Sequence, residues 1–335
     1  MRWRDNFRSA YPVIVLSLSI AVAAFFVMRW APPEPGLRLA RSSSDDGNPL
    51  VRTGSKTYPR RAIDSDDAEV RMVRPAQRIV SQYWSIDEFV YAVVPPERVV
   101  AVSESAYNPQ ISNVLDSVNR FHPVIATDPE RVLRLNSDLI LVASTARADF
   151  TNLLRGAGYP IYRIYTMFTN LKQIQDHIQL VGYLTGEDER AAEELQQFQR
   201  EIGQARARKP VEAASPRILG LGGRYSYGSQ TLFHDIVRAV GGINVGAENG
   251  LSGYEQVSSE QILRWNPDWI VASADKDQTK QVLERLLADP SIALTSAAQK
   301  KQILVFEHRA FLPMSPYSRI FVTALSKALY EGNTQ

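Results

Sequence analysis

Glu130-Arg-Val-Leu-Arg-Leu-Asn-Ser-Asp138 runs directly into Leu139-Ile-Leu-Val-Ala143, and this pattern occurs twice in the chain. The second copy is Glu260-Gln-Ile-Leu-Arg-Trp-Asn-Pro-Asp268, followed by Trp269-Ile-Val-Ala-Ser273. Each copy predicts a short helix, a tight turn at Asn-Ser-Asp or Asn-Pro-Asp, and a buried strand. Two copies so far apart indicate a duplicated domain rather than a solenoid, whose repeats are about 20–50 residues long. The chain is therefore predicted to contain two lobes of similar architecture.

The segments around the two copies alternate between strand and helix patterns. Predicted strands cover 79–81, 98–103, 139–143, 161–165, 217–221, 269–273 and 303–306, and predicted helices cover 84–93, 148–157, 232–240, 279–288 and 317–330. Such alternation is typical of βαβ units and a mostly parallel sheet. The predicted fold class is α/β, with an N-terminal lobe at 76–169 and a C-terminal lobe at 209–335.

A long helical pattern lies between the lobes, at Leu171–Arg208. Its apolar residues have helical spacing on both sides of Gly186, and no strand pattern interrupts it. About ten turns of helix would fit this length. We therefore expect a single long and rigid connecting helix over residues 170–208.

The N-terminal region has the composition of a membrane segment followed by a linker. Residues 9–28 are uncharged and mostly apolar, and about 20 such residues are long enough to cross a bilayer. Arg2, Arg4 and Arg8 precede them, which favours a cytoplasmic N-terminus. Residues 1–30 are predicted to be an uncleaved membrane anchor, with a cleaved signal peptide as the alternative. Residues 31–75 are rich in proline, serine and mixed charges, so we expect a disordered tether.

The overall composition is that of a globular protein. The chain has 335 residues, of which 44% are hydrophobic and 22% charged, and its formal net charge is +2. This near-neutral charge gives no indication of a nucleic-acid partner. The chain has no cysteine, which excludes disulfides and thiolate metal sites.

Ligands in open α/β sheets bind beyond the carboxyl ends of the strands, so residues at those ends are candidates for ligand binding. They are mostly aromatic, with a few cations: Gln82, Tyr83, Trp84, Tyr107 and Thr166 in the first lobe, and Arg224, Tyr225, Tyr227, Tyr254, Arg309 and Phe311 in the second. Aromatic rings stack on flat apolar surfaces, and arginine pairs with carboxylates. This set suits a large flat ligand with acidic edges, and the predicted ligand-binding residues are Tyr83, Trp84, Tyr107, Arg224, Tyr227, Tyr254 and Arg309. In the alternative interpretation, half of the tyrosines only pack against their own lobe.

Other site chemistries find little support in the sequence. Gly220-Leu-Gly-Gly223 lacks the full Gly-x-Gly-x-x-Gly spacing of a dinucleotide site, and no phosphate loop or nucleophile elbow occurs. A metal site would need three histidines with a carboxylate, or a similar set. The four histidines lie in separate segments, so no metal site and no cofactor are predicted; they are His122, His177, His234 and His308. Tyr107 or a histidine as a haem ligand stays an alternative.

Taken together, these segments resemble the periplasmic solute-binding proteins for cobalamin, ferric siderophores and haem, which serve ABC importers. The resemblance covers about residues 76–331 and rests on Arg78-Ile-Val-Ser81, Arg98-Val-Val-Ala-Val102, the Glu-x-x-Leu-x-x-x-x-Asp-Leu-Ile repeat, the long helix and Gly241-Gly242-Ile-Asn244. It implies a class III periplasmic binding protein, in which one long helix joins two α/β lobes and the ligand is held between them. The implied partners are a metal chelate (ferric siderophore, cobalamin or haem) and an ABC permease dimer. The implied location is the periplasmic face of the cytoplasmic membrane, or the periplasm if residues 1–30 are cleaved.

The same resemblance implies that a surface glutamate on each lobe docks onto the permease, and these glutamates fall on Glu130 and Glu260. Local roles are the alternative, because Thr127 and Glu130 fit a capping box. A glutamate paired with an arginine four residues later also stabilises a helix by about 0.2–0.5 kcal/mol. Two features depart from the family: Gln82-Tyr-Trp84 replaces a small, proline-containing turn, and a long tether replaces the usual cleaved signal or lipid anchor.

Two functions of different class are consistent with the sequence. The first is a binding protein that delivers a metal chelate to a permease. The second is a chelatase-like enzyme, or a protein that binds a metal ion directly, using histidines. No motif that brings together an acid, a base or a nucleophile occurs, which favours the binding protein over the enzyme.

Overall fold

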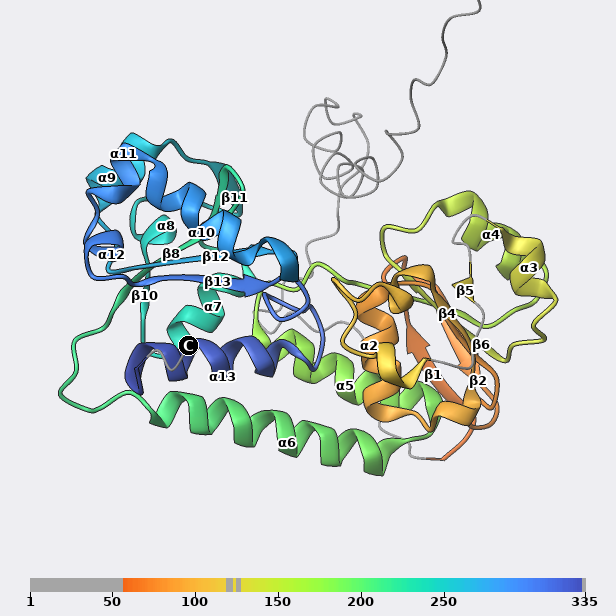
Figure 1. Cartoon of the computed structure of the whole chain (residues 1–335). Coiled ribbons are helices and arrows are strands. Elements are labelled where there is room, and N and C mark those ends of the chain that lie inside the picture. The colour runs from red at the N-terminus through yellow and green to blue at the C-terminus, as the bar shows by residue number, and fades with distance from the viewer. Residues whose placement is uncertain (1–56, 119–122, 125–127, 333–335) are drawn as a thin grey trace, which may run out of the picture. The chain divides into compact units, whose positions relative to one another are not determined.

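The computed structural model describes residues 57–118, 123–124 and 128–332 (Figure 1). These residues belong to one unit of the chain, Asp46–Gln335. No helix in these described ranges is long and apolar enough to cross a bilayer. The predicted membrane segment, residues 9–28, lies outside the described residues and stays a prediction.

The first lobe contains a five-stranded parallel sheet with the order β5-β4-β3-β6-β7. Its strands are β3 (Ile79–Ser81), β4 (Val99–Ser103), β5 (Pro123–Val124), β6 (Leu139–Ala143) and β7 (Ile161–Ile164). β6 is buried along its whole length. Because successive side chains of a strand point to opposite faces, Leu139 and Leu141 join one core cluster and the residue between them, Ile140, joins another.

Helices cover both faces of this sheet. The helices and short 3₁₀ turns of the lobe are α2 (Trp84–Val93), η1 (Pro96–Arg98), η2 (Glu104–Tyr107), η3 (Leu115–Ser117), α3 (Pro129–Leu133) and α4 (Ala148–Gly156). α2 contributes Ile86, Phe89 and Val90 to the larger cluster. α4 contributes Phe150 and Leu154 to the smaller cluster on the other face. The helix-and-strand alternation predicted for this lobe is confirmed.

The second lobe contains a six-stranded mixed sheet with the order β11-β9-β8-β12-β13, in which β10 also pairs with β8. Its strands are β8 (Arg217–Gly222), β9 (Tyr225–Tyr227), β10 (Ile243–Asn244), β11 (Tyr254–Gln256), β12 (Trp269–Ala274) and β13 (Ile303–Glu307). β8, β10, β12 and β13 are parallel, whereas β9 and β11 are antiparallel to their neighbours. The sequence analysis did not predict β9, β10 and β11, which have only two or three residues each. The predicted class, α/β with mostly parallel sheets, holds.

The helices of the second lobe also divide between two faces. They are α7 (Leu232–Ala239), α8 (Val245–Glu248), α9 (Ser259–Trp265), η4 (Lys276–Gln278), α10 (Thr279–Ala288), α11 (Pro290–Ala293), α12 (Ser296–Gln299) and α13 (Ser318–Tyr330). α7 and α13 contribute Phe233 and Phe321 to the larger core cluster. α9 and α11 contribute Ile262 and Ile292 to a separate cluster with the alternate side chains of the sheet.

Both copies of the sequence repeat fold in the same way. In each copy the asparagine of the turn has a left-handed φ, 47° in one and 43° in the other, which asparagine adopts more readily than most residues. The aspartate two residues later accepts a hydrogen bond from the backbone N–H of an arginine at the start of a strand, at 2.7 and 2.9 Å. The side chain of that arginine also donates to two backbone carbonyl groups of the repeat, where its short helix ends and the turn begins. The equivalent residues are Asn136, Asp138 and Arg78 in the first lobe and Asn266, Asp268 and Arg217 in the second.

The segment between the lobes contains two helices, α5 (Leu171–Thr185) and α6 (Asp188–Ala207), so the expectation of one uninterrupted helix is wrong. Gly186 ends α5 with a left-handed φ of 80°, and the chain folds back. The two helices approach so closely that a Cβ on Gly182 would lie 2.4 Å from that of Ala191. The chain breaks here because burying the apolar faces of both helices against each other requires a turn.

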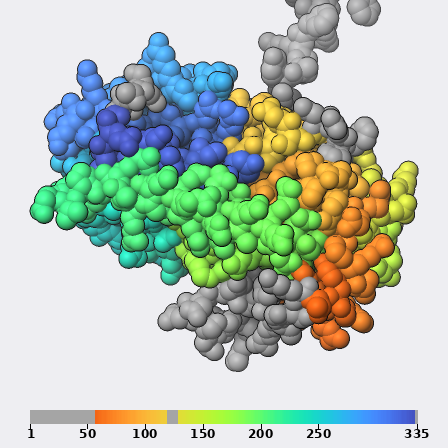
Figure 2. All heavy atoms as spheres, turned by 90° about the horizontal axis from the view of Figure 1, so that it is seen from below, coloured from red at the N-terminus to blue at the C-terminus, as the bar shows by residue number. Residues whose placement is uncertain are grey.

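α6 alone leads into the second lobe, and its twenty residues span about 30 Å. It packs along α13, where Arg319 pairs with Glu194 at 2.5 Å and Arg208 pairs with Glu331 at 2.7 Å. Figure 2 shows α5 and α6, in green, on the face that it views. A single long helix therefore joins the lobes as predicted, but that helix is α6 and not the whole of 170–208.

The folded part of the chain begins before the predicted boundary at residue 76. β1 (Arg60–Ile63) and β2 (Glu69–Met72) form an antiparallel hairpin. Arg60 is buried, where it donates to the carbonyl of Tyr183 at 2.8 Å and pairs with Asp188 at 2.7 Å. The prediction of a disordered tether up to residue 75 is therefore wrong for residues 57–75. Each strand has only four residues, two of them charged, so the sequence pattern of this segment resembles that of a polar linker.

Candidate functional site

Four aromatic side chains form a cluster at the edge of the second sheet, and we call Tyr227, Phe233, Tyr254 and Phe311 the aromatic cluster. Tyr227 on β9 lies opposite Tyr254 on β11, with ring centroids 5.4 Å apart in an edge-to-face arrangement. The Tyr227 ring also lies 5.0 Å from Phe233 and 5.8 Å from Phe311. Phe233 is fully buried, whereas both tyrosines are partly exposed. The aromatic cluster therefore extends from the buried core to the surface, where its two tyrosines are partly exposed.

The two tyrosines of the aromatic cluster are neutral at physiological pH. Burial raises the pKa of both Tyr227 and Tyr254 above the ordinary value of 10.0. A neutral phenol can donate and accept a hydrogen bond, while its ring offers an apolar face. The cluster therefore presents apolar ring surface without a charged phenolate.

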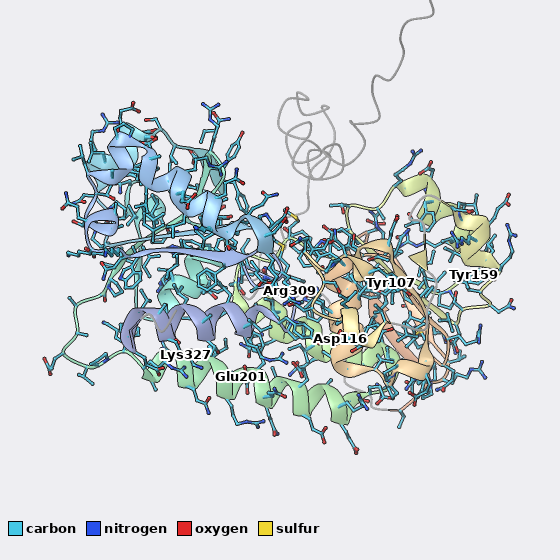
Figure 3. All side chains as sticks on the ribbon, viewed as in Figure 1. Tyr107, Asp116, Tyr159, Glu201, Arg309 and Lys327 are labelled. Carbon is cyan, nitrogen blue, oxygen red and sulfur yellow. The ribbon has the colours of Figure 1, made fainter. Side chains whose placement is uncertain are left out.

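The first-lobe candidates lie at the two places where the sequence analysis expected them. Tyr83 and Trp84 begin α2 directly after β3, and their ring centroids are 5.9 Å apart. Tyr107 lies on η2 after β4, and its hydroxyl donates to the carbonyl of Val118 at 3.1 Å (Figure 3). Of the remaining candidates, Gln82 and Thr166 are buried. Tyr83, Trp84 and Tyr107 are partly exposed, so they are better placed than Gln82 and Thr166 to touch a ligand.

The two candidate arginines differ in how far they are free to pair with a ligand. Arg224 is exposed in the turn between β8 and β9. Arg309, on the loop after β13, donates from Nε to the carboxylate of Glu307 at 3.0 Å. The positive charge of Arg309 is therefore already balanced by Glu307, and Arg224 is the more available partner for an acidic group on a ligand. That these arginines and the aromatic residues of both lobes face one cleft stays a prediction.

The sequence analysis missed a buried carboxylate at the contact between the lobes. Glu88 on α2 accepts hydrogen bonds from the backbone and side-chain amides of Asn113 at 3.0 and 2.8 Å, and from Ser315 Oγ at 2.5 Å. The Asn113 side chain also donates to the carbonyl of Arg309 at 2.9 Å. Burial raises the pKa of Glu88 to about 7. The sequence does contain an indication of this carboxylate, because Asp87 and Glu88 form an acidic pair inside a mostly apolar helix.

Comparison with known proteins identifies the family. The sequence pattern of the periplasmic binding proteins matches residues 79–310, which is more than half of the chain. The chain belongs to this family. Membership implies an extracytoplasmic location and agrees with the resemblance seen in the sequence.

Similar members of the family have been named for what they bind. A cobalamin-binding protein of Halobacterium salinarum is 26% identical over 246 residues, which are 72% of this chain and 66% of that protein. A vitamin B12-binding protein of Yersinia pestis is 27% identical over 210 residues, covering 62% of this chain and 73% of that protein. The structure of the periplasmic heme-binding protein RhuT from Roseiflexus sp. RS-1 has a TM-score of 0.64 and 25% identity, covering 76% of this chain and 98% of that one. These relatives are binding proteins.

The described histidines of this periplasmic binding protein are His177 on α5, His234 on α7 and His308 after β13. His177 is buried against Phe168, with ring centroids 4.7 Å apart, and burial lowers its pKa to about 4. His308 lies 3.1 Å from Ser273 Oγ. His122 lies outside the described residues. Across the part of the chain that the structure describes, no three histidine, aspartate or glutamate side chains are grouped to hold a metal ion.

Glu130 and Glu260 occupy equivalent places on the two lobes of this periplasmic binding protein. Glu130 on α3 has 83% of its side chain exposed and lies 3.7 Å from Arg134. Glu260 is exposed in the first turn of α9, and hydrogen bonds from its own backbone N–H and from Ser258 hold its pKa below the usual range. The capping box predicted at Thr127 is not the cap of α3, because Asp128 accepts from the backbone N–H of Arg131; Thr127 itself lies outside the described residues.

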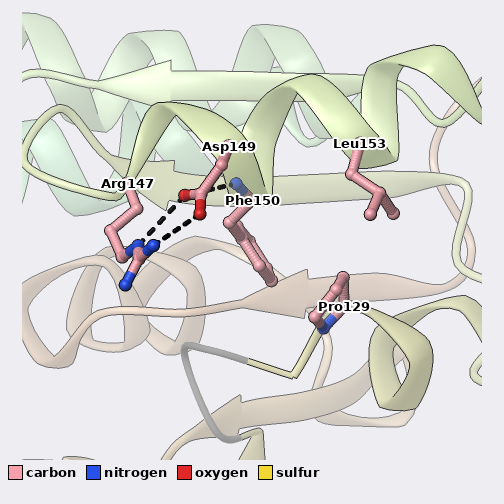
Figure 4. Close-up of a pocket in the computed structure, with 5 residues that line it drawn as sticks. All are labelled: Pro129, Arg147, Asp149, Phe150 and Leu153. Carbon is pink, nitrogen blue, oxygen red and sulfur yellow. Dashed lines mark hydrogen bonds and ion pairs between the residues drawn. The ribbon is translucent and has the colours of Figure 1, made fainter.

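A pocket of about 240 Å³ lies between residues of α3 and α4 in the first lobe (Figure 4). Its lining residues are Pro129, Arg147, Asp149, Phe150 and Leu153. Two of these lining residues, Arg147 and Asp149, pair with each other at 2.6 Å, and Leu153 is half exposed. The pocket lies beside α3 and contains none of the residues predicted to bind the ligand.

Proposed function

We propose that this protein is the extracytoplasmic substrate-binding component of an ABC importer and that it captures a metal chelate between its two lobes. The chelate would be a cobalamin, a haem or a ferric siderophore. Membership of the periplasmic binding protein family supports the binding role, and its relatives named for cobalamin and heme support the ligand class. The observation that carries the ligand class most directly is the aromatic cluster, which offers large ring faces on a rigid base.

The proposed ligand site combines the aromatic cluster of the second lobe with Tyr83 and Trp84 of the first lobe. Corrin and porphyrin rings are broad and apolar, so they can stack on Tyr227, Tyr254 and the Trp84 ring. Both macrocycles and many siderophores carry acidic or amide side groups at their edges, for which Arg224 is an exposed partner. The loop that carries Arg309 and Phe311 closes the second-lobe side of the site.

The proposal includes the partners of the binding protein. Glu130 and Glu260 would each contact one subunit of a two-fold symmetric permease, because the duplicated lobes present them in equivalent places. Residues 9–28 would hold the protein at the periplasmic face of the membrane, by the length and composition of that segment. Both parts of the proposal rest on the sequence and the family.

An absorbance titration tests the ligand class. Full-length protein in detergent is titrated with cyanocobalamin, haemin and a ferric hydroxamate siderophore, each of which is coloured. We expect a saturable spectral change with one of the three and a rise in melting temperature, because a ligand bound only by the native state stabilises it. Absence of binding by all three chelates would refute the proposed function.

Truncation of Tyr254 tests the location of the site. Tyr254→Ala should weaken binding of the chelate identified above by about 1–3 kcal/mol, as removal of an aromatic contact residue does. Tyr330→Ala is the matched control, because it truncates another partly buried tyrosine at the end of α13. Equal affinity of the Tyr254 variant and the wild type, with both folded, would place the ligand elsewhere.

A further inference from the structure

The contact between the lobes is built around one buried carboxylate. Glu88 belongs to the first lobe and is 1% exposed. One of its carboxylate oxygens binds Asn113 in the same lobe, and the other binds Ser315 in the second lobe. Asn113 in turn reaches the second lobe through the carbonyl of Arg309. The interlobe contact, defined as Glu88, Asn113, Arg309 and Ser315, thus joins α2 to both ends of the loop at 309–315.

A carboxylate in this position is costly unless every one of its oxygens is hydrogen-bonded, because burial removes its hydration. Glu88 has three donors, and one of them comes from the other lobe. A third bond between the lobes, from the Lys276 backbone N–H to Gln110 Oε1 at 3.2 Å, lies at the exposed surface, where water competes with it. Of these three bonds, the one from Ser315 is fully buried, so water does not readily replace it when it is lost.

The neighbouring residue of α2 provides an internal comparison. Asp87 is as buried as Glu88, and Ser103 Oγ donates to it at 2.5 Å, the same distance as that between Ser315 and Glu88. Both residues of the Asp87 pair lie in the first lobe. The two carboxylate–serine pairs are thus alike in length and burial, and only the Glu88 pair joins the lobes.

The loop that Glu88 holds carries two residues of the proposed ligand site. Phe311 belongs to the aromatic cluster, and Arg309 is a predicted ligand-binding residue. We propose that Glu88 is a positioning residue, which fixes the loop at 308–316 of the second lobe against α2 of the first before any ligand binds. The inference that this loop then meets a ligand rests on the proposed function, whereas the interlobe contact itself does not.

Hydrogen exchange on the ligand-free protein tests the positioning role. The readout is the exchange rate of the amides of Ala310 and Phe311, which hydrogen-bond within the loop to Glu307 and not to any mutated side chain. In Ser315→Ala these amides should exchange roughly tenfold faster or more, the effect of leaving a buried acceptor without its donor. In Ser103→Ala they should exchange as in the wild type. The amides of β6 report global unfolding in each variant, so that a general loss of stability is separated from release of the loop.

The ligand arm uses the chelate identified by the titration, with cyanocobalamin and haemin as the first probes. Ser315→Ala should bind it more weakly than Ser103→Ala does, since a released loop must be ordered again on binding. If the loop amides of Ser315→Ala exchange no faster than those of Ser103→Ala, the positioning role is refuted, whether or not the wild type binds a chelate. If they exchange faster while no chelate binds to the wild type, Glu88 still positions the loop and it is the proposed function that fails.

Discussion

At the scale of single residues, the acidic pair on α2 is the least expected feature of the chain. Asp87 and Glu88 lie in a helix whose other buried residues are apolar except Ser85, and burial raises the pKa of each to about 7. Hydrogen bonds from Ser103 partly offset this effect for Asp87, as those from Ser315 and Asn113 do for Glu88. The native state therefore holds protons that the unfolded chain would release in the same pH range.

We expect the stability of the protein to fall as pH rises from about 4 to 7. The folded-state pKa of Asp87 lies above the ordinary value of 3.8, so its contribution is complete below pH 3.8 and is lost as pH rises through about 7. Asp87→Asn cannot ionise, and the slope of unfolding free energy against pH should be shallower in this variant. Urea denaturation at intervals between pH 4 and 8 measures that slope.

The surface variant Asp149→Asn is the control for this measurement, because the Asp149 pKa is shifted in the opposite direction by its hydrogen bond with Arg147. It should not reduce the loss of stability toward neutral pH. A slope in Asp87→Asn equal to that of the wild type would contradict the assignment of the pH dependence to α2.

At the scale of elements, the β1–β2 hairpin changes the boundary of the folded protein. Asp64 in its turn is 2% exposed and accepts from the backbone N–H groups of Asp66 and Ala68, at 2.9 and 3.0 Å. It also pairs with Arg155 of α4. The hairpin is thus held to the first lobe by a buried ion pair, and not only by its own ladder.

Asp64→Ala should destabilise the protein by about 3–5 kcal/mol, the usual result of removing one partner from a buried ion pair. Glu69→Ala in the same hairpin is the control, since the Glu69–Arg61 pair is exposed at 3.7 Å and should contribute about 0–1 kcal/mol. Urea denaturation gives both values. Similar small effects of the two substitutions would mean that residues 57–75 behave as the linker that the sequence analysis expected.

At the scale of the whole molecule, the connection between the lobes limits their movement. α6 is a continuous helix of 20 residues without a loop to absorb changes in φ and ψ. Contacts at Glu88 and along α13 restrain the second lobe further. A hinge closure of large amplitude would have to break both.

We therefore expect small-angle scattering curves of the protein with and without its ligand to be nearly superimposable. The restraint is α6, so the radius of gyration should stay the same within error. A measurable compaction on ligand binding would show that the lobes close about a hinge in spite of it.

The double charge reversal Glu130→Lys with Glu260→Lys should abolish transport by the cognate importer while ligand affinity stays unchanged. The physical reason is that both side chains are exposed and do not belong to the aromatic cluster, and that under the proposed function each would contact one permease subunit. Glu97→Lys with Glu284→Lys reverses one exposed glutamate on each lobe outside the docking helices and serves as the control. Normal transport by the first double variant, at normal protein level, would leave the two glutamates with only a local role in their helices.

The sequence alone determined the α/β class, the duplicated unit and the place of most helices and strands. These properties depend on residues within a few positions of each other, such as the apolar spacing of α2 or the left-handed asparagine of each turn. The sequence also indicated the tyrosines of the aromatic cluster. Tyr227 follows the strand β8, and Tyr254 precedes the second copy of the repeat.

Only the tertiary structure decided which of those elements meet. Whether α5 and α6 continue in one line or fold back depends on the close approach at Gly182, 9 residues before its neighbour Ala191. The burial of the hairpin depends on Arg155 and Tyr183, which follow it by more than 80 residues. Glu88 finds its partner Ser315 at a separation of 227 residues. Local sequence patterns do not predict such contacts. They form only when apolar faces from distant segments pack together and bury the polar groups that lie between them.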